Sequence, residues 1–298
     1  AANTRTRSAR NIHAHYDLGN RFYELFLDGE TLSYSCAIWP PAAASAARAD
    51  DRARAERSAL AGELAASQRA KHERLCELLA LGPRDHLLEI GCGWGGMAIH
   101  AAKTRGCRVT AVTISREQPA LASTRVAEAG LAHRVSVELR DYRDVTGAFD
   151  KIVSIEMLEA VGHEYLPDFF AACDRLLAPG GRIAIQTITM PDERYAEYRS
   201  RVDWMQTYIF PGSCIPSLGA IRGALADTAL NIAAAHDIGP DYAPTLRAWR
   251  ERFVAAQPAV RALGFDEPFV RTWLLYLAFS EAAFAERTLA DHQLVLER

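Results

Sequence analysis

The spacing of hydrophobic positions changes near residue 83 of the chain. Before this point, an Ala-, Arg- and Glu-rich stretch over residues 42–81 has Leu75, Leu78 and Leu79 on one helical face and stops at Gly82-Pro83, which predicts one long helix or two in tandem. After it, short apolar runs alternate with helical patterns, and this alternation is typical of a parallel sheet flanked by helices. The expected fold class is therefore α/β.

The same pattern predicts the individual elements. Strands are expected over residues 86–90, 108–113, 135–139, 150–155, 182–189, 231–238 and 292–297, and helices over residues 94–104, 115–129, 164–177, 217–229 and 267–285. Between the fifth and sixth strands, apolar and aromatic residues recur at roughly helical spacing over residues 192–210. With its flanks, at about residues 192–216, this helical insertion is expected to form a mobile lid.

Composition narrows the classes of function. The chain has 298 residues, of which 49% are hydrophobic, so it can bury a sizeable core and is not expected to be disordered. The 34 Lys and Arg residues balance the 37 Asp and Glu residues without a long run of one sign, which argues against nucleic-acid binding. The 6 cysteines include no CxxC pair, so we expect neither a metal site nor a disulfide framework, and a reducing cytoplasm is favoured.

The termini and apolar runs bear on location. No apolar run reaches the length that spans a bilayer, and we recognise no cleavable signal before the expected fold. Any lipid would then be met from the cytosolic side. The chain begins at Ala1 without a methionine, so we expect a processed protein or a part of a longer one.

A glycine-rich loop follows the first expected strand. The loop Gly91-Cys92-Gly93-Trp94-Gly95-Gly96 leads into a helix; glycines allow a sharp turn and close approach of a ligand, and the helix N-terminus favours a negative group. The loop matches the dinucleotide pattern GxGxxG, but the acid that should hold a ribose about 20 positions later is absent from Val112-Thr113-Ile114-Ser115. NAD is therefore disfavoured.

The residues around the loop point to another nucleotide. Glu89 precedes the loop, which makes this segment similar to the E/DxGxG loop of S-adenosylmethionine-dependent methyltransferases. In such a site, the carboxylate can serve the ammonium group of the ligand. Asp141 and Tyr142, just after the third expected strand, would receive the adenine amine and cover the adenine ring.

Longer motifs extend the resemblance over nearly the whole chain. They are HYDLGN (15–20), YSCA (34–37), LEIGCGWGG (88–96), RDYRD (140–144) and YIFPG (208–212). With them, the chain resembles the cyclopropane-fatty-acyl-phospholipid synthase and mycolic acid methyltransferase family. The resemblance implies a class I S-adenosylmethionine-dependent methyltransferase fold, in which a Rossmann-like, seven-stranded, mostly parallel sheet is flanked by helices.

The resemblance also implies a domain organisation and a cofactor site. A helical cap would occupy residues 1–82, and a single methyltransferase core with the lid insertion would occupy residues 83–298. S-adenosylmethionine would be contacted by Tyr34, Ser35, Glu89, Gly91, Cys92, Gly93, Thr113, Ile114, Gln118, Asp141, Tyr142 and Arg143.

The chemistry of this family sets further expectations. An isolated alkene is a poor nucleophile, so the sulfonium methyl must contact it in a dry, oriented and apolar pocket. Methyl transfer leaves a carbocation, and a weakly nucleophilic base must then take a proton. The resemblance implies that this base is a bicarbonate ion held at Cys36, Glu159, Gln186, Ile188 and Tyr242, with Glu159 orienting its proton. Tyr16 and Trp39 would either stabilise the carbocation by cation–π attraction or simply pack.

The chain departs from the family at four positions in these motifs and near its C-terminus. The common FEHVG is Leu158-Glu159-Ala160-Val161-Gly162 here, and the common HTI is Gln186-Thr187-Ile188, so both histidines are absent while the acid is kept. The Gln186 amide can still donate an N–H to an anion. A cysteine that is frequent near the C-terminus of the family is Ser280 here. This variant resembles a branch that includes long-chain fatty-acid C-methyltransferases and the methyltransferase portion of plant-type cyclopropane synthases.

The expected function is S-adenosylmethionine-dependent transfer of a one-carbon unit to the double bond of an unsaturated fatty acyl chain, on a phospholipid, to give a cyclopropane. One alternative is a C-methyltransferase that gives a methylene- or methyl-branched chain. Another is a cofactor- or lipid-binding protein that has lost catalysis. We expect a cytoplasmic protein, peripheral at the inner membrane surface, and leave a homodimer open.

Overall fold

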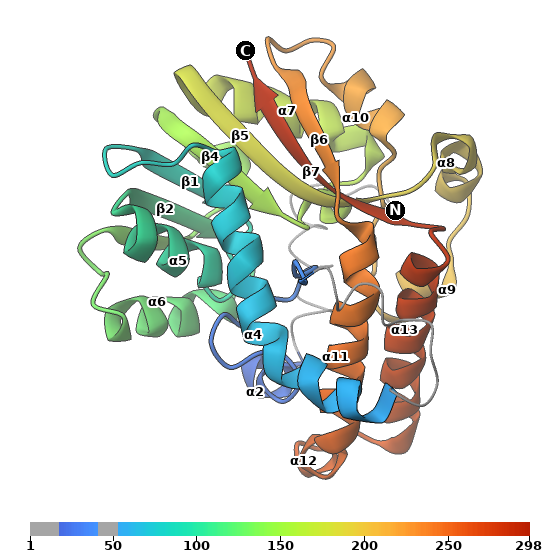
Figure 1. Ribbon diagram of the computed structural model, residues 1–298. Helices are drawn as coiled ribbons and strands as arrows, with labels where there is room; N and C mark the ends of the chain where they lie inside the picture. Colours follow the sequence, from blue (N-terminus) through green and yellow to red (C-terminus); the bar gives the residue numbers. More distant parts are fainter. Residues whose placement is uncertain (1–17, 41–52) are drawn as a thin grey trace.

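The computed structural model describes residues 18–40 and 53–298 of the chain, and within them seven strands form one sheet (Figure 1). The strand order is β3-β2-β1-β4-β5-β7-β6. The strands are β1 (His86–Ile90), β2 (Arg108–Thr113), β3 (Val135–Leu139), β4 (Phe149–Ile155), β5 (Leu177–Thr189), β6 (Asn231–Asp237) and β7 (Ala290–Glu297). Strands β1 to β5 pair in parallel, whereas β7 pairs antiparallel with both β5 and β6.

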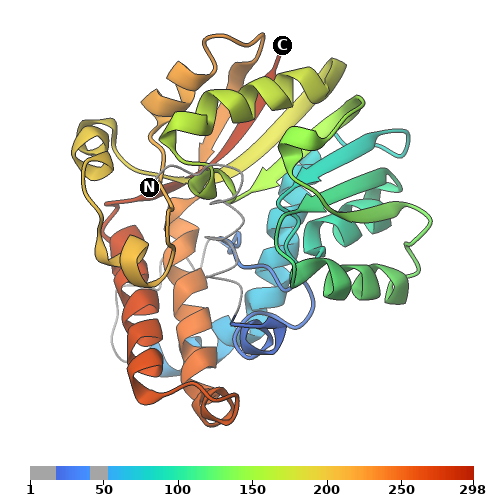
Figure 2. The same cartoon turned by 180° about the vertical axis from the view of Figure 1, so that it is seen from behind.

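Helices cover both faces of the sheet. On one face lie α4 (Ala53–Leu78), α5 (Gly96–Arg105) and α6 (Gln118–Glu128), and α4 and α5 share an apolar core with β1 and β2. On the other face lie α7 (Leu166–Leu176) and α10 (Leu218–Ala224), with a second apolar core beneath them (Figure 2). The fully buried centre of the sheet explains why its strands are almost continuously apolar in the sequence.

A helical unit packs beside the sheet. It consists of α2 (Asn20–Glu24), α11 (Tyr242–Ala255), α12 (Gln257–Ala262) and α13 (Glu267–Ala285), and α11 and α13 run side by side in both views. Aromatic rings fill its core, with Phe22 in edge-on contact with Trp273 and Phe26 with Trp249. This unit closes the side of the sheet at which the glycine-rich loop lies.

The lid insertion consists of two short helices, α8 (Asp192–Arg199) and α9 (Trp204–Tyr208). Asp203 and Gln206 form a capping box that fixes the start of α9. Short 3-10 turns complete the fold at η2 (Tyr142–Asp144), η3 (Leu158–Ala160), η4 (His163–Tyr165) and η5 (Gly239–Asp241).

The expected fold class is confirmed, and so are three strands to the residue, β1, β2 and β3. The fifth strand begins at Leu177, five positions before the expected start, because a glycine turn at residues 180–181 does not interrupt it. The expected helix over residues 42–81 is one continuous helix where it is described, from Ala53 to Leu78; residues 42–52 and Tyr16 lie outside the described residues.

Helices α2, α11 and α12 were not expected from the sequence. The start of α11 carries Pro244, which in a longer pattern indicates a break. Here Pro244 lies in the first helical turn, where no intrahelical N–H bond is lost.

No helix in the described ranges is both long and apolar enough to cross a membrane.

Candidate active site

The glycine-rich loop turns the chain sharply between β1 and α5. The backbone N–H groups of Gly91 and Cys92 donate to Val112 O at 2.9 and 3.1 Å, which ties the loop to the end of β2. Gly93 has a φ of 51°, in the left-handed region that favours glycine, and a Cβ built on it would meet no atom within 4 Å. The loop therefore presents bare backbone to an open space.

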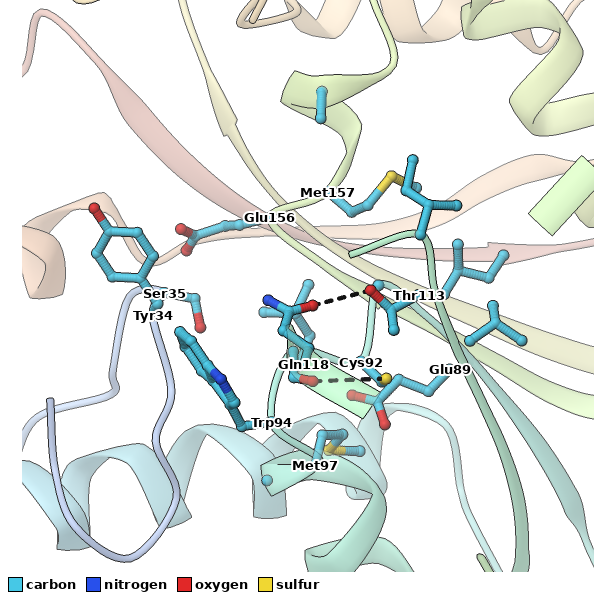
Figure 3. Close-up of a pocket in the computed structure, with 18 of the residues that line it drawn as sticks. Tyr34, Ser35, Glu89, Cys92, Trp94, Met97, Thr113, Gln118, Glu156 and Met157 are labelled. Atoms are coloured by element: carbon cyan, nitrogen blue, oxygen red, sulfur yellow. Dashed lines mark hydrogen bonds between the residues drawn. The ribbon is translucent and has the colours of Figure 1, made fainter. Parts of the chain in front are cut away.

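That open space is a pocket, here called the loop pocket, lined by the glycine-rich loop, the segment Thr31–Ser35 and the ends of β2, β3 and β4 (Figure 3). The structure places all twelve residues expected to contact S-adenosylmethionine in its wall. They are Tyr34, Ser35, Glu89, Gly91, Cys92, Gly93, Thr113, Ile114, Gln118, Asp141, Tyr142 and Arg143.

Two of these residues replace the acid that a dinucleotide site would need. At the end of β2, the Thr113 hydroxyl donates to Gln118 Oε1 at 2.9 Å (Figure 3). Both side chains are buried and neutral, so a ribose would meet a hydroxyl and an amide. This arrangement gives no support to NAD.

Asp141 is held differently from the expectation. Its Oδ1 accepts from Arg143 Nε at 2.9 Å and from Arg143 N at 3.0 Å, and its Oδ2 accepts from Arg143 Nη2 at 2.5 Å, so Arg143 engages both oxygens at the 3-10 turn η2. The Tyr142 ring packs edge-on against Phe169, which fixes it at the pocket wall. Tyr142 can therefore cover a ring, while Asp141 also shapes the turn.

A buried acid, Glu89, and a buried amine, Lys71, line the inner end of the loop pocket. Burial raises the pKa of the Glu89 carboxyl to about 8, although the nearby Lys71 ammonium opposes the shift. Its Oε2 has no partner among the described residues. Burial in turn lowers the pKa of the Lys71 ammonium to about 8, and the only hydrogen bond of that ammonium in the described part is to Ser35 Oγ, at 2.7 Å.

Lys71 was not identified from the sequence. It lies in the middle of the long Ala-rich helix, where a lysine normally faces solvent, yet its side chain is fully buried. Its rarity is the one signal the sequence offers, since the chain has only three lysines.

The donors that were expected to hold bicarbonate converge on another side chain, Glu156. Cys36 N and Gln186 Nε2 donate to Glu156 Oε1 at 2.7 and 2.9 Å, and the Tyr242 hydroxyl donates to Glu156 Oε2 at 2.5 Å. Glu156 directly follows β4 with a φ of 47°, and its side chain projects between the loop pocket and the segment at Tyr34 (Figure 3). Sequence reasoning missed this residue.

Glu159 and Ile188 lie beside this group and not within it. Glu159 Oε1 accepts from Ile188 N at 2.5 Å and from the Thr187 hydroxyl at 3.0 Å, while its Oε2 has no partner in the described ranges. Burial, reinforced by the negative charge of Glu156, raises the pKa of Glu159 to about 8. Glu159 therefore faces Glu156 across the site as a second acid.

The residues do not fit a bicarbonate ion at the expected place. The three expected donors that reach this place are already used by the Glu156 carboxylate. The Cys36 thiol points to the carbonyl oxygens of Ala37 and Ile238, and burial raises its pKa well above the usual range. A second anion beside Glu156 would meet like charge.

A second pocket, here called the lid pocket, adjoins the first. Its wall is mostly apolar and combines the lid with β5 and α13, including Met205, Phe210, Ile215, Phe279 and Leu289. Glu159, Ile188 and Ser280 also line it. Glu156 and Ala160 belong to the walls of both pockets, so the two meet at the Glu156 carboxylate.

The expected aromatic pair does not form part of these walls. The Trp39 indole N–H donates to the Thr245 hydroxyl at 2.9 Å, and the ring is buried in the helical core. It lines neither of the two pockets, which supports the packing alternative.

The loop pocket fits S-adenosylmethionine on its own contacts. The open backbone at Gly93 leaves room for a close approach, the unpartnered Glu89 Oε2 suits an ammonium group, and the buried Lys71 ammonium suits a carboxylate. Tyr142 offers a flat face for a base. The zwitterionic end and the adenine of that cofactor would thus both find partners.

Comparison with known proteins places these pockets in context. Residues 3–294 match the family model described as mycolic acid cyclopropane synthetase. The chain is 46% identical over 296 residues to the tuberculostearic acid methyltransferase UfaA1 of Mycobacterium tuberculosis, covering 99% of this chain and 66% of that protein. It is 37% identical over 285 residues to the cyclopropane-fatty-acyl-phospholipid synthase of Escherichia coli K12, covering 95% of this chain and 66% of that protein. The chain thus spans just under two thirds of the length of these relatives.

Solved structures give the same fold. The cyclopropane synthase MmaA2 from Mycobacterium tuberculosis superposes with a TM-score of 0.83 at 27% identity, covering 97% of this chain and 98% of that one. The mycolic acid cyclopropane synthase CmaA1, in complex with S-adenosylhomocysteine (SAH), gives the same values. The sheet and its flanking helices are therefore those of a class I S-adenosylmethionine-dependent methyltransferase.

Proposed function

The chain belongs to the mycolic acid cyclopropane synthetase family, and from this premise we propose that it transfers a one-carbon unit from S-adenosylmethionine to the double bond of an unsaturated fatty acyl chain. The observation that carries the proposal is the meeting of two pockets at one carboxylate. The loop pocket suits the cofactor, the apolar lid pocket suits a hydrocarbon chain, and Glu156 lies in the wall of both.

Different residues would bind the cofactor and the acyl chain. S-adenosylmethionine, when bound, supplies an electrophilic methyl group. The loop Gly91–Gly96, Lys71 and Glu89 would hold the cofactor, while the apolar wall of the lid pocket would align the acyl chain and exclude water. Alignment and desolvation are what a weakly nucleophilic alkene requires.

Two products are compatible with this chemistry. After methyl transfer, the carbocation loses one proton; the electrons of that C–H bond either close a cyclopropane or, after a hydride shift, form a methylene group. Both products are the substrate plus CH₂. We favour the methylene-branched product. Glu156, the acid at the junction of the two pockets, accepts hydrogen bonds on both oxygens. If this carboxylate takes the proton, those bonds weaken it as a base, and slower proton removal leaves time for the shift. The 46% identical relative, named as a methyltransferase, supports this choice.

The cyclopropane with bicarbonate as base is the second candidate. The family description and the name of the Escherichia coli relative favour it. It requires Glu156 to leave its three donors so that the ion can bind them.

Mass spectrometry decides between these outcomes. The chain is expressed in a host rich in unsaturated phospholipids, and total fatty acids are analysed before and after hydrogenation. A gain of CH₂ establishes transfer, and uptake of one H₂ by the new product identifies an alkene in place of a ring. No gain of CH₂, with SAH still bound in calorimetry, would instead support a non-catalytic cofactor-binding protein.

We extend the proposal to the lipid that carries the acyl chain and to the place in the cell where the protein acts. The exposed guanidinium of Arg194 lines the lid pocket, and a guanidinium suits a phosphate, which supports a phospholipid substrate. Tyr208 and Phe279 are 65% and 59% exposed near the lid pocket, so we propose peripheral contact with the inner membrane surface from the cytoplasm. A homodimer is left to a measurement of mass in solution.

A further inference from the structure

The Glu156 carboxylate occupies the place that the family resemblance assigns to a bicarbonate ion. We propose that Glu156 is the built-in base of this enzyme, so that its side chain replaces the ion and removes the proton after methyl transfer. The inference rests on the proposed function, because it names the group that completes that reaction.

Three hydrogen bonds hold the Glu156 carboxylate in place. Three donors from distant parts of the chain, Cys36 N, Gln186 Nε2 and the Tyr242 hydroxyl, converge on its two oxygens. Three hydrogen bonds to a carboxylate stabilise the anion strongly. Without this side chain, Cys36 N and the Tyr242 hydroxyl would lose the acceptor that they have here, while Gln186 Nε2 would keep Cys36 O at 3.2 Å and Asp291 Oδ2 at 3.3 Å. Donors that converge in this way form the environment of an anion-binding site.

Glu156 also lies at the junction of the two pockets. Its carboxylate lies in the wall of the loop pocket and of the lid pocket, where a methyl donor and an alkene would meet. Among the titratable groups in the described part of the chain that interact with it, Lys71 carries an amine, while Glu159 and Asp291 are acids. A proton acceptor belongs at this junction, because the proton leaves the substrate there.

A carboxylate beside S-adenosylmethionine could itself be methylated, and the hydrogen bonds to Glu156 make this reaction less favourable. Glu156 Oε1 already accepts two bonds and Oε2 one, which reduces the nucleophilicity of both oxygens. Gln186 Nε2 also contacts Asp291 Oδ2 at 3.3 Å, and Asp291 itself hydrogen bonds with Glu156. Burial, with the charge of Glu156, raises the pKa of Asp291 well above its usual range, so a protonated Asp291 can donate a further hydrogen bond to this carboxylate and keep its proton.

The proposed step balances. A C–H bond of the methylated carbocation breaks, and its electron pair forms the new C–C bond of a ring or the C=C bond of a methylene group. The proton forms an O–H bond on Glu156 and leaves to water when the product departs. Methyl donor and alkene thus give SAH, product and one proton.

The backbone at Glu156 supplies an independent observation and a useful variant. A φ of 47° is rare for a residue other than glycine and costs on the order of 1–2 kcal/mol. The chain keeps a glutamate there despite that cost. Glycine adopts this conformation without strain, so Glu156→Gly should fold and leave the three donors open.

The test compares variants in buffers with and without bicarbonate. Turnover of the wild type is expected to be equal in both, and Glu156→Gln should lose turnover by roughly 10²–10⁴ with unchanged SAH affinity. Glu156→Gly should be inactive without bicarbonate and partly restored by it. Glu164→Gln, at an exposed acid nearby, is the matched control and should behave as wild type.

Binding of ¹³C-labelled bicarbonate, followed by NMR, gives a readout that does not depend on turnover. Glu156→Gly should bind the ion, and the wild type should not. A wild type that binds bicarbonate and needs it for turnover would overturn the inference. Full turnover in Glu156→Gln would overturn it as well. In either case, Glu159→Gln should lose more turnover than Glu156→Gln. A wild type that adds no CH₂ in any buffer would refute the proposed function itself.

Discussion

At the residue scale, a single glycine controls access to the loop pocket. Gly93 has left-handed backbone and open space where a side chain would project, so Gly93→Val should fill the cofactor site without disturbing the core. We expect SAH binding to be lost in calorimetry while the far-UV circular dichroism spectrum is unchanged.

The control for this prediction is Gly130→Val. Gly130 also has a positive φ, 71°, and open space around it, but it lies outside both pockets. Equal loss of SAH binding in both variants would mean that backbone strain, and not occlusion, is responsible.

The buried ammonium of Lys71 gives a second prediction. It faces the loop pocket with one neutral partner in the described part of the chain, so it should bind the carboxylate of the cofactor. Lys71→Met should weaken SAH binding about tenfold or more, since a hydrogen bond to a charged group contributes roughly 1.5–3 kcal/mol. Binding of 5′-methylthioadenosine, which has no carboxylate, should not change.

Calorimetry with both ligands checks this, with the exposed Lys103→Met as control. An equal loss for both ligands would assign Lys71 a purely structural role.

The buried Glu89 predicts a pH dependence of stability in the ligand-free protein. Its pKa rises from 4.5 to about 8 on folding, so between these values the folded state holds a proton that the unfolded state has lost. The free energy of unfolding therefore falls as pH rises through this window, by up to about 1.4 kcal/mol per pH unit. The contribution of Glu89 to stability is therefore fully present below pH 4.5 and is lost as the pH rises through about 8.

Glu89→Gln should remove this contribution, so that the variant gains stability relative to wild type from pH 5 to pH 8. Urea unfolding at several pH values measures the difference. Parallel pH profiles for the two proteins would contradict the buried, protonated state of Glu89.

At the element scale, the lid differs from the sheet in how it is held. Helices α8 and α9 are short. Arg194, Tyr198 and Met205 line the lid pocket, and Trp204 and Met205 reach the aromatic core only as partly buried side chains. Strand β1, in contrast, is buried along nearly its whole length. Few buried contacts predict low local stability. Amide exchange over residues 192–210 should be faster than in β1 and β4, and should slow when an unsaturated lipid is added.

Hydrogen-exchange mass spectrometry tests the lid, with α13 as the internal reference because it forms the fixed wall of the same pocket. Exchange in residues 192–210 as slow as in β1, and indifferent to lipid, would exclude a lid role.

At the scale of the whole molecule, two exposed apolar side chains lie on α13, one of which, Phe279, lines the lid pocket. Leu275 and Phe279, 53% and 59% exposed, share one face of α13 four positions apart. Exposed apolar residues beside a hydrocarbon pocket suit a lipid surface. Phe279→Asp combined with Leu275→Asp should reduce co-sedimentation with phosphatidylglycerol vesicles while SAH binding is retained.

The matched control is Leu139→Asp, which changes an equally exposed residue, 58%, at the end of edge strand β3. A similar loss of sedimentation in the control would indicate a general effect of negative charge on vesicle binding.

The sequence by itself determined the sheet, the glycine-rich loop and the cofactor wall. Strands such as β2 are buried runs whose apolar pattern is local, and Gly93 is required by the backbone at its own position. Ten of the twelve residues expected to contact the cofactor lie at or shortly after the ends of β1, β2 and β3, and the carboxyl ends of parallel strands meet at one edge. Tyr34 and Ser35 come from the segment between α2 and α4.

Only the tertiary structure decided which group sits at the centre of the site. Cys36, Gln186 and Tyr242 come from a loop, a strand and a helix start, and folding directs all three to Glu156. In the sequence, Glu156 is one of two acids after the same strand, and the motif drew attention to Glu159. A left-handed φ, a buried lysine such as Lys71 and the union of two pockets depend on contacts between distant segments, which no local pattern records.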